Sequence, residues 1–290
     1  MVGEGFLLNI LAKRNSSHLI QLSAKIPPLT SSSYSLCLIV GRHRNDRLRM
    51  IKMNLKTTLI GLAILTLTNC TSKAQQTTHT VKIVGEMRNV MWKGHLYGSI
   101  NLDTIANKTN LYGLGPVEYL AGEILIIDGK SYKSTVTSDT TMEVEETYDI
   151  KAPFFAYANI SRWTAQPLPD SIQTIQQLEI YLDKVTKNSP RPFIFKLAGI
   201  VEHAIIHVVN LQKGSKVSSP EEAHNGQRKY ELHNEQVDIV GFFSLEHKTI
   251  FTHHDTYLHM HLMTTDKQKM GHLDEVLFKK GTIKLYLPAE

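Results

Sequence analysis

Apolar side chains and histidines alternate one residue at a time near the C-terminus, and this pattern constrains the fold more than any other. Residues 258–263 read Leu-His-Met-His-Leu-Met. Alternation with a period of two is typical of a β-strand whose two faces meet different surroundings. We therefore expect the apolar members to face a core, while His259 and His261 share the other face of the strand.

A polar stretch follows this strand and predicts a β-hairpin. The stretch centres on Asp266 and Lys267 and leads to Gly271 and His272. If the chain reverses here, His272 lies beside His261 on the neighbouring strand. Directly opposed residues of an antiparallel pair have Cβ atoms about 5 Å apart. Three imidazoles would then converge on one point.

Such a convergence predicts that His259, His261 and His272 bind one transition metal. Three neutral imidazoles with an open fourth position are typical of a catalytic zinc site rather than a structural one. Iron, copper, nickel or manganese would also accept imidazole ligands, so zinc is the first choice among several divalent metals. The alternative is a histidine-rich surface, since the chain contains 14 histidines. We interpret His253 and His254 as solvent-exposed bystanders in a loop.

The rest of the chain is typical of a β-rich α+β protein. A strand is expected at 122–129, ending in an Asp128-Gly129 turn from which a second strand returns. Apolar residues at helical spacing predict one helix, at 171–187. Further strands are expected at 193–197, 204–211, 237–243 and 281–287, and the polar stretch 212–235 is interpreted as a long loop.

An apolar run at 59–67 has the layout of a signal-peptide core. It follows Lys56 and is too short to span a bilayer. Residues 67–70, Leu-Thr-Asn-Cys, resemble a lipoprotein cleavage box with Cys70 as the lipidated residue, and cleavage after Ala74 is the second interpretation. We therefore predict that 53–74 is a lipoprotein or secretory signal. The protein would be exported, either periplasmic or anchored to the membrane by a lipid on Cys70.

Residues 1–52 lie upstream of that signal, and we interpret them as an extension from a start codon assigned too early. The segment 1–74 holds 10 of the 32 Lys and Arg but only two of the 27 acidic residues, so 75–290 carries a net charge near −3. This charge removes the support for a nucleic-acid partner. Both cysteines, Cys37 and Cys70, precede residue 75, so no disulfide is expected in the domain that follows.

Four blocks of this sequence resemble the alpha-acetolactate decarboxylases, from about Tyr97 to Leu287. One contains Gly-Glu-Ile-Leu-Ile-Ile-Asp-Gly at 122–129, and another is the histidine hairpin, similar to the family's His-Leu-His-Phe and Gly-Gly-His. The other two are Pro-Phe-Ile-Phe-Lys-Leu-Ala-Gly at 192–199 and Ile-Val-Gly-Phe at 239–242.

The resemblance implies a fold, a site and a reaction. Two β-rich, barrel-like lobes, about 80–190 and 191–290 of an acetolactate decarboxylase-like domain 75–290, would hold the metal in the cleft between them. The three histidines would be zinc ligands, and Glu123 would match the family's active-site glutamate. The reaction implied is decarboxylation of 2-acetolactate, a small hydroxy-keto acid, to acetoin, and the assembly implied is a homodimer. A cupin barrel, which also uses His-x-His and a distant histidine, is the alternative fold.

Two departures from the family pattern bear on the reaction. Counting without gaps, the position of the family's active-site arginine falls on His207, which we therefore take as a candidate catalytic residue. Histidine does not replace the fixed, bidentate guanidinium of arginine. A second family glutamate comes from beyond the last strand, whereas this sequence ends at Glu290. Two alternatives therefore stay open. One is a metal enzyme of this fold acting on another 2-hydroxy-3-keto acid, or a tautomerase-like relative; the other is a non-catalytic, metal- or ligand-binding lipoprotein.

Overall fold

A computed structural model describes residues 8–12, 20–24, 80–252 and 255–289. The chain divides into two units, Met1–Gln76 and Thr77–Glu290. In the first unit, β1 (Leu8–Ala12) pairs antiparallel with β2 (Ile20–Ala24). The predicted signal with Cys70, and the loop histidines 253 and 254, lie outside the described residues. Within the described part of the chain, no helix has the length and apolar character needed to cross a membrane.

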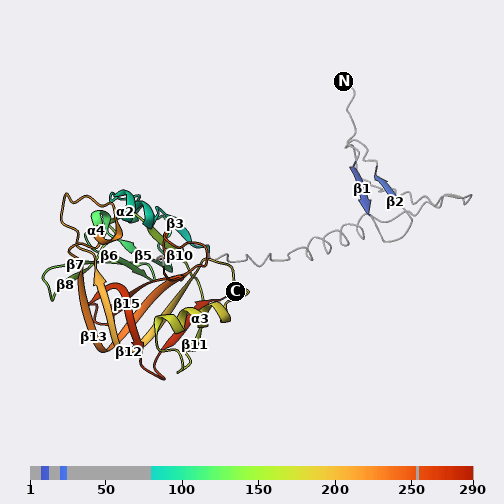
Figure 1. Cartoon of the computed structure of the whole chain (residues 1–290). Helices are drawn as coiled ribbons and strands as arrows, with labels where there is room; N and C mark the ends of the chain where they lie inside the picture. Colours follow the sequence, from blue (N-terminus) through green and yellow to red (C-terminus); the bar gives the residue numbers. More distant parts are fainter. Residues whose placement is uncertain (1–7, 13–19, 25–79, 253–254, 290) are drawn as a thin grey trace, which may run out of the picture. The chain divides into compact units, whose positions relative to one another are not determined.

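The second unit contains two six-stranded antiparallel sheets (Figure 1). The first sheet has the order β3 (Lys82–Val84), β10 (Phe155–Asn159), β5 (Leu111–Pro116), β6 (Glu123–Ile127), β7 (Lys130–Val136), β8 (Met142–Glu146). The second has the order β11 (Trp163–Pro167), β16 (Lys284–Pro288), β12 (Phe193–Val208), β13 (Arg228–Phe243), β14 (Leu258–Thr264), β15 (Met270–Phe278). A small pair, β4 (Ile100–Asn101) and β9 (Lys151–Ala152), completes the described strands of this unit.

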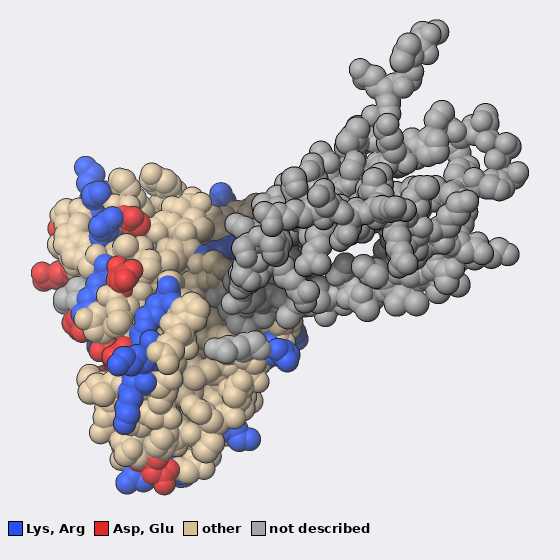
Figure 2. Space-filling model, turned by 90° about the vertical axis from the view of Figure 1, so that its right-hand side faces the viewer, with Lys and Arg blue, Asp and Glu red and all other residues tan. Residues whose placement is uncertain are grey.

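Short helices connect and cover these sheets. They are α2 (Met87–Lys93), α3 (Ile175–Val185), α4 (Pro220–Ala223) and two 3₁₀ turns, η1 (Leu102–Thr104) and η2 (Glu118–Leu120). The predictions of a β-rich α+β protein and of two sheets are confirmed. Figure 2 shows Lys and Arg side chains interspersed with Asp and Glu on one face of this unit.

The second sheet closes on itself, because β12 pairs with β13 along one edge and with β15 along the other. The strands that close it are long, with 16 residues each in β12 and β13. Alternate residues therefore point into an enclosed core or outward. The enclosed core includes, among others, Ala204, Ile206, Leu232, Ile239, Met260 and Leu262.

The outward face of the closed sheet packs against the first sheet. Their shared core joins Leu114 and Leu125 of the first sheet to Val240, Phe242 and Met263 of the second, all buried. Residues of odd number on β14 therefore meet another sheet rather than solvent, and the whole strand is buried. As predicted, the apolar residues at alternate positions of β14 lie in a core.

The Asp-Gly turn forms as the sequence predicts. Asp128 and Gly129 both have positive φ, at 48° and 78°, and they join β6 to β7. A two-residue hairpin with a type I′ turn needs this left-handed backbone at both positions, which Asp tolerates and Gly favours.

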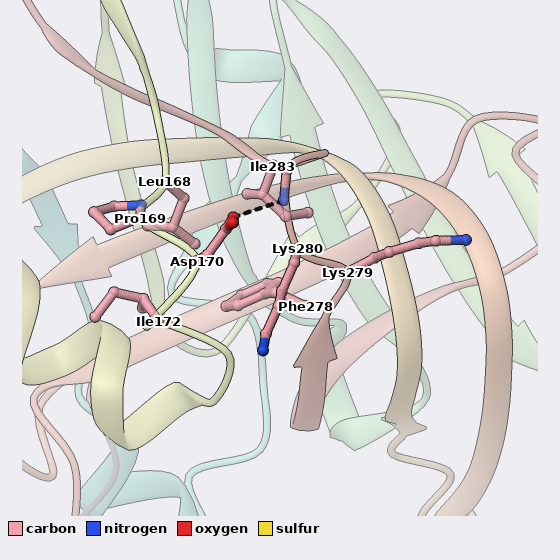
Figure 3. Close-up of a pocket in the computed structure, with 9 residues that line it drawn as sticks. Leu168, Pro169, Asp170, Ile172, Phe278, Lys279, Lys280 and Ile283 are labelled. Carbon is pink, nitrogen blue, oxygen red and sulfur yellow. Dashed lines mark hydrogen bonds between the residues drawn. The ribbon is translucent and has the colours of Figure 1, made fainter.

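The predicted helix at 171–187 is shorter at its start. Thr174 caps α3 through a capping box with Gln177, so the helix begins at Ile175. Close to the start of the helix, Asp170 accepts a hydrogen bond from the Gly281 amide at 2.8 Å, in a small pocket that Phe278 and Ile283 also line (Figure 3). Leu178 and Leu182 are fully buried in the core of the second sheet.

Two sequence expectations were wrong in the second sheet. The strands expected at 193–197 and 204–211 are one strand, β12, and the expected loop 212–235 contains α4 and the first half of β13. The start of β13 is polar because only alternate residues, such as Tyr230 and Leu232, enter the core. The lobe boundary at 191 stays a prediction, although β11 and the residues of α3 already pack with the second sheet.

Candidate metal centre

Three buried histidines meet on β14 and β15, and we call them the histidine triad: His259, His261 and His272. His261 pairs directly with His272 across the hairpin, as the sequence predicts. One ligand nitrogen from each ring lies within 4.8 Å of the others. The residues are 3%, 0% and 8% exposed, respectively.

Local sequence explains how the triad is brought together. The Lys267 amide donates to the Thr264 carbonyl at 2.8 Å and closes the turn between the strands. Thr264 and the Gln268 amide both donate to the Asp266 carboxylate, which holds the turn. Gly271 allows β12 to approach, because a Cβ there would lie 2.5 Å from the His207 carbonyl.

The donor set of the triad fits a divalent transition metal. The Nδ1–H of His259 donates to the Phe251 carbonyl at 2.6 Å, which leaves Nε2 as the ligand atom. A metal-binding histidine commonly has its second nitrogen fixed in this way by a carbonyl or carboxylate. Three buried imidazoles are suited to zinc, copper, iron or nickel rather than to magnesium or calcium, which prefer oxygen ligands.

Glu123 reaches the triad from the first sheet. It is the first residue of β6, and its Oε2 lies 3.6 Å from His261 Nε2. Gly122 places it there with a φ of 156°, where a Cβ would meet the Ser134 carbonyl at 2.2 Å. The amide of Val209 donates to Glu123 Oε1 at 3.3 Å. Burial raises the pKa of the Glu123 carboxyl well above its usual range, although the Val209 hydrogen bond opposes this.

His207 lies next to both Glu123 and the triad, and its ring centroid is 4.7 Å from that of His272. It lies on β12 opposite His272, and its Nε2 is 4.0 Å from Glu123 Oε1. Its Nδ1–H donates to Asp274 at 2.6 Å, and Lys229 approaches the second oxygen of that carboxylate at 3.2 Å. Burial of Asp274 disfavours its charge, but the hydrogen bond and charge of His207, with Lys229, lower its pKa overall.

The structure thus brings all five sequence-predicted site residues together. They meet where the two sheets pack, and all five are buried: Glu123, His207, His259, His261, His272. The first comes from one sheet and the other four come from the second. The metal-binding and catalytic roles of these residues stay predictions, as does the cleft between lobes.

Sequence reasoning missed three neighbours of this site. Asp274 follows His272 by two residues on one strand, so strand periodicity could have found it. His224 packs edge-on against His207 with ring centroids 5.9 Å apart, and its Nδ1–H donates to the Pro220 carbonyl. Burial, and then the neighbouring His207, lower the pKa of His224. The third neighbour is the Phe251 carbonyl, which accepts the hydrogen bond from His259. Neither this carbonyl nor the contact of His224 with His207 has a local sequence signal.

Comparison with known proteins finds one matching family and several similar folds. A family model for alpha-acetolactate decarboxylase matches residues 84–288. The fold is similar to alpha-acetolactate decarboxylase from Bacillus subtilis strain 168, with a TM-score of 0.60, 17% identity, and 72% of this chain and 86% of that chain covered. The enzyme from Bacillus subtilis subspecies spizizenii gives a TM-score of 0.61 at 18% identity, with the same coverage.

A third solved structure is a Staphylococcus aureus protein of unknown function, described as similar to alpha-acetolactate decarboxylase. It gives a TM-score of 0.59 at 18% identity and covers 71% of this chain and 84% of that chain. Comparison with curated protein sequences gives no match. At these identities the structures show the fold alone, while the family model spans most of the chain. The chain belongs to the alpha-acetolactate decarboxylase family.

Proposed function

We propose that this protein is a zinc-dependent enzyme that decarboxylates 2-acetolactate to acetoin. The observation that carries the proposal is the position of Glu123, a buried carboxyl 3.6 Å from His261 Nε2 in the histidine triad. A protein that only binds metal has no need of such an acid beside the ligands. Membership of the family supports a carboxy-lyase acting on a small-molecule substrate.

The proposed reaction needs charge stabilisation and a proton. When the bond between C2 and the carboxylate breaks, CO2 leaves and the electron pair moves toward the ketone oxygen. A zinc ion held by the triad would supply Lewis-acid stabilisation of that negative charge. Glu123 supplies the proton, and burial, which raises the pKa of its carboxyl, favours the neutral, donating form. The Val209 amide fixes Oε1, which orients the carboxyl.

His207 takes the place at which the family resemblance expects an arginine. Asp274 accepts its Nδ1–H at 2.6 Å, so the other ring nitrogen points toward Glu123. We propose that this nitrogen contacts the substrate carboxylate. A single imidazole bond is weaker than the paired bonds of a guanidinium, so we expect weaker substrate binding than an arginine would give.

Two measurements on the full-length protein test the proposal. Bound metal is measured by elemental analysis, and acetoin is measured after addition of 2-acetolactate. Zinc at one or more equivalents together with acetoin release is the expected result. Stoichiometric zinc without acetoin would reject the reaction.

His207 also favours a second candidate, a related metal enzyme that acts on another 2-hydroxy-3-keto acid. The same metal-loaded protein is offered a series of these acids, and CO2 release is recorded for each. Release from another acid at a higher kcat/KM than from 2-acetolactate would select this second candidate. Zinc without CO2 from any member would leave a non-catalytic binding protein.

We also propose that the protein is exported as a lipoprotein, since a short apolar run precedes Cys70. Labelled palmitate should enter the wild-type protein and not the Cys70→Ser variant. Labelling that persists in the variant would reject the lipid site. The proposed homodimer is tested separately, by measuring the mass of the purified protein in solution.

A further inference from the structure

A second group of metal-ligand side chains lies on the ribbon formed by β12 and β13, and we call it the ribbon cluster: His203, Glu231 and His233. One ligand atom from each of the three lies within 4.8 Å of the others. Glu231 Oε2 is 3.9 Å from His203 Nε2 and 3.4 Å from His233 Nε2. We propose that the ribbon cluster is a second site for a divalent transition metal, separate from the histidine triad.

Strand register brings the two imidazoles of the ribbon cluster together. His203 on β12 is paired directly with His233 on β13. Opposed residues of an antiparallel pair have Cβ atoms about 5 Å apart, and the two rings lie 5.0 Å apart with a 39° tilt. Glu231 precedes His233 by two residues and therefore projects from the same face of β13.

The backbone under the ribbon cluster is held by the core of the closed sheet. Ala204 and Leu232, the neighbours of His203 and His233, are directly paired and buried on the opposite face. Because these strands are anchored, both imidazoles are presented from fixed backbone positions. A site built on paired strands holds its ligands more closely to one geometry than a site on a loop does.

The ligand types indicate which ions would bind. Two imidazoles and one carboxylate form a set that suits zinc, copper or nickel, whereas calcium and magnesium prefer oxygen ligands alone. The side chains are 34% exposed for His203, 65% for Glu231 and 64% for His233. Water can therefore complete the coordination, and we expect weaker binding than at the buried triad.

The two sites are far enough apart to hold separate ions. His203 and His207 are four residues apart on β12, which corresponds to about 13 Å along a strand. The carboxyl of Glu231 approaches the two histidines of its own cluster, while Glu123 lies beside the triad. Metal at the ribbon cluster therefore counts as an additional equivalent.

Metal stoichiometry tests the inference on the full-length protein. The protein is stripped with a chelator and titrated with Zn²⁺ in competition with a chromophoric chelator. We expect two equivalents for the wild type and one for the double variant His203→Ala, His233→Ala. The matched control is His95→Ala, which removes an exposed histidine outside both clusters and should keep two equivalents.

A milder variant guards against loss of folding in the double variant. Glu231→Gln keeps the shape of the side chain, removes its charge and should weaken the second equivalent by about tenfold or more. Equal numbers of zinc equivalents in the wild type and in the double variant would overturn the inference, as would unchanged affinity in Glu231→Gln. Because the measurement counts zinc rather than acetoin, its outcome is independent of the proposed reaction.

Discussion

The histidine triad and the ribbon cluster use the same side chain at opposite levels of burial. The triad residues are at most 8% exposed and lie between two packed sheets. The side chains of the ribbon cluster are 34% to 65% exposed and lie on the outward face of two neighbouring strands, β12 and β13, of the closed sheet. Both groups bring their ligand atoms within the same 4.8 Å. The spacing of ligand atoms therefore does not by itself distinguish a reactive site from a surface site.

What differs is the chemistry that burial imposes on neighbouring groups. Next to the triad, desolvation raises the pKa of the Glu123 carboxyl and so favours its protonated form. Glu231 is mostly exposed, so water surrounds its carboxyl group. Of these two clusters, only the triad has a buried carboxyl beside its ligands, so we expect catalysis there and metal binding alone at the ribbon cluster.

The largest difference between the two clusters is expected in the His261→Ala variant. The ring is fully buried and belongs to the triad, so its loss removes one ligand and leaves a cavity. We expect zinc affinity at the triad to fall by more than about 100-fold, above the effect of losing an outer hydrogen-bond partner. Acetoin release should fall to background while the ribbon cluster keeps its equivalent. Zinc titration and acetoin assay on one sample check this, and full retention of both zinc equivalents would contradict the metal site.

The Glu123→Gln variant tests the role of the acid separately from metal binding. The amide keeps the shape of the carboxyl but has no proton to transfer. We expect kcat to fall by about 10²- to 10⁴-fold, the usual contribution of a positioned acid, with zinc content unchanged. Wild-type kcat in this variant would exclude Glu123 as the proton donor. Loss of zinc would indicate instead that Glu123 supports the ligands.

The parts of the site that depend on local sequence were predictable. The alternation on β14 and the polar turn after it predicted that His261 lies beside His272. The Asp128-Gly129 turn predicted the hairpin between β7 and β6, the strand that begins at Glu123. The role assigned to Glu123 itself came from the family resemblance. A lone carboxylate at a strand start has no distinguishing pattern.

Long-range pairing accounts for what sequence reasoning missed. The contact of His207 with Asp274 depends on the register between β12 and β15, which contains two irregularities. The start of β13 looked like a loop because its outward residues are charged, although Tyr230 alternates regularly with its exposed neighbours. His203 and His233 are both visible in the sequence, but their pairing could not be predicted without the register between β12 and β13.

A smaller effect is expected from His207→Ala. Loss of one charge-assisted contact to the substrate carboxylate is worth about 1.5–3 kcal/mol, or roughly 10- to 100-fold in kcat/KM. Zinc content should stay unchanged, since His207 lies outside the triad. Asp274→Asn is the matched variant, because it frees the His207 ring without removing it, and it should cost less. An unchanged KM for 2-acetolactate in His207→Ala would show that this ring does not hold substrate.

The smallest effect concerns His224, whose pKa is lowered by burial and by the neighbouring His207. A histidine with a lowered folded pKa is neutral in both states above its unfolded value, about 6.5, and resists protonation when folded. Its contribution to stability is therefore present above that pH and is lost as the pH falls through the folded pKa. In His224→Gln, we expect the free energy of unfolding to fall less steeply as the pH drops below about 6.5. Urea unfolding of metal-free wild type and variant at matched pH checks this, and parallel curves would show that His224 titrates alike in both states. A less steep pH dependence of the unfolding free energy in the variant would show that burial near the triad changes the proton affinity of His224 as well as that of Glu123.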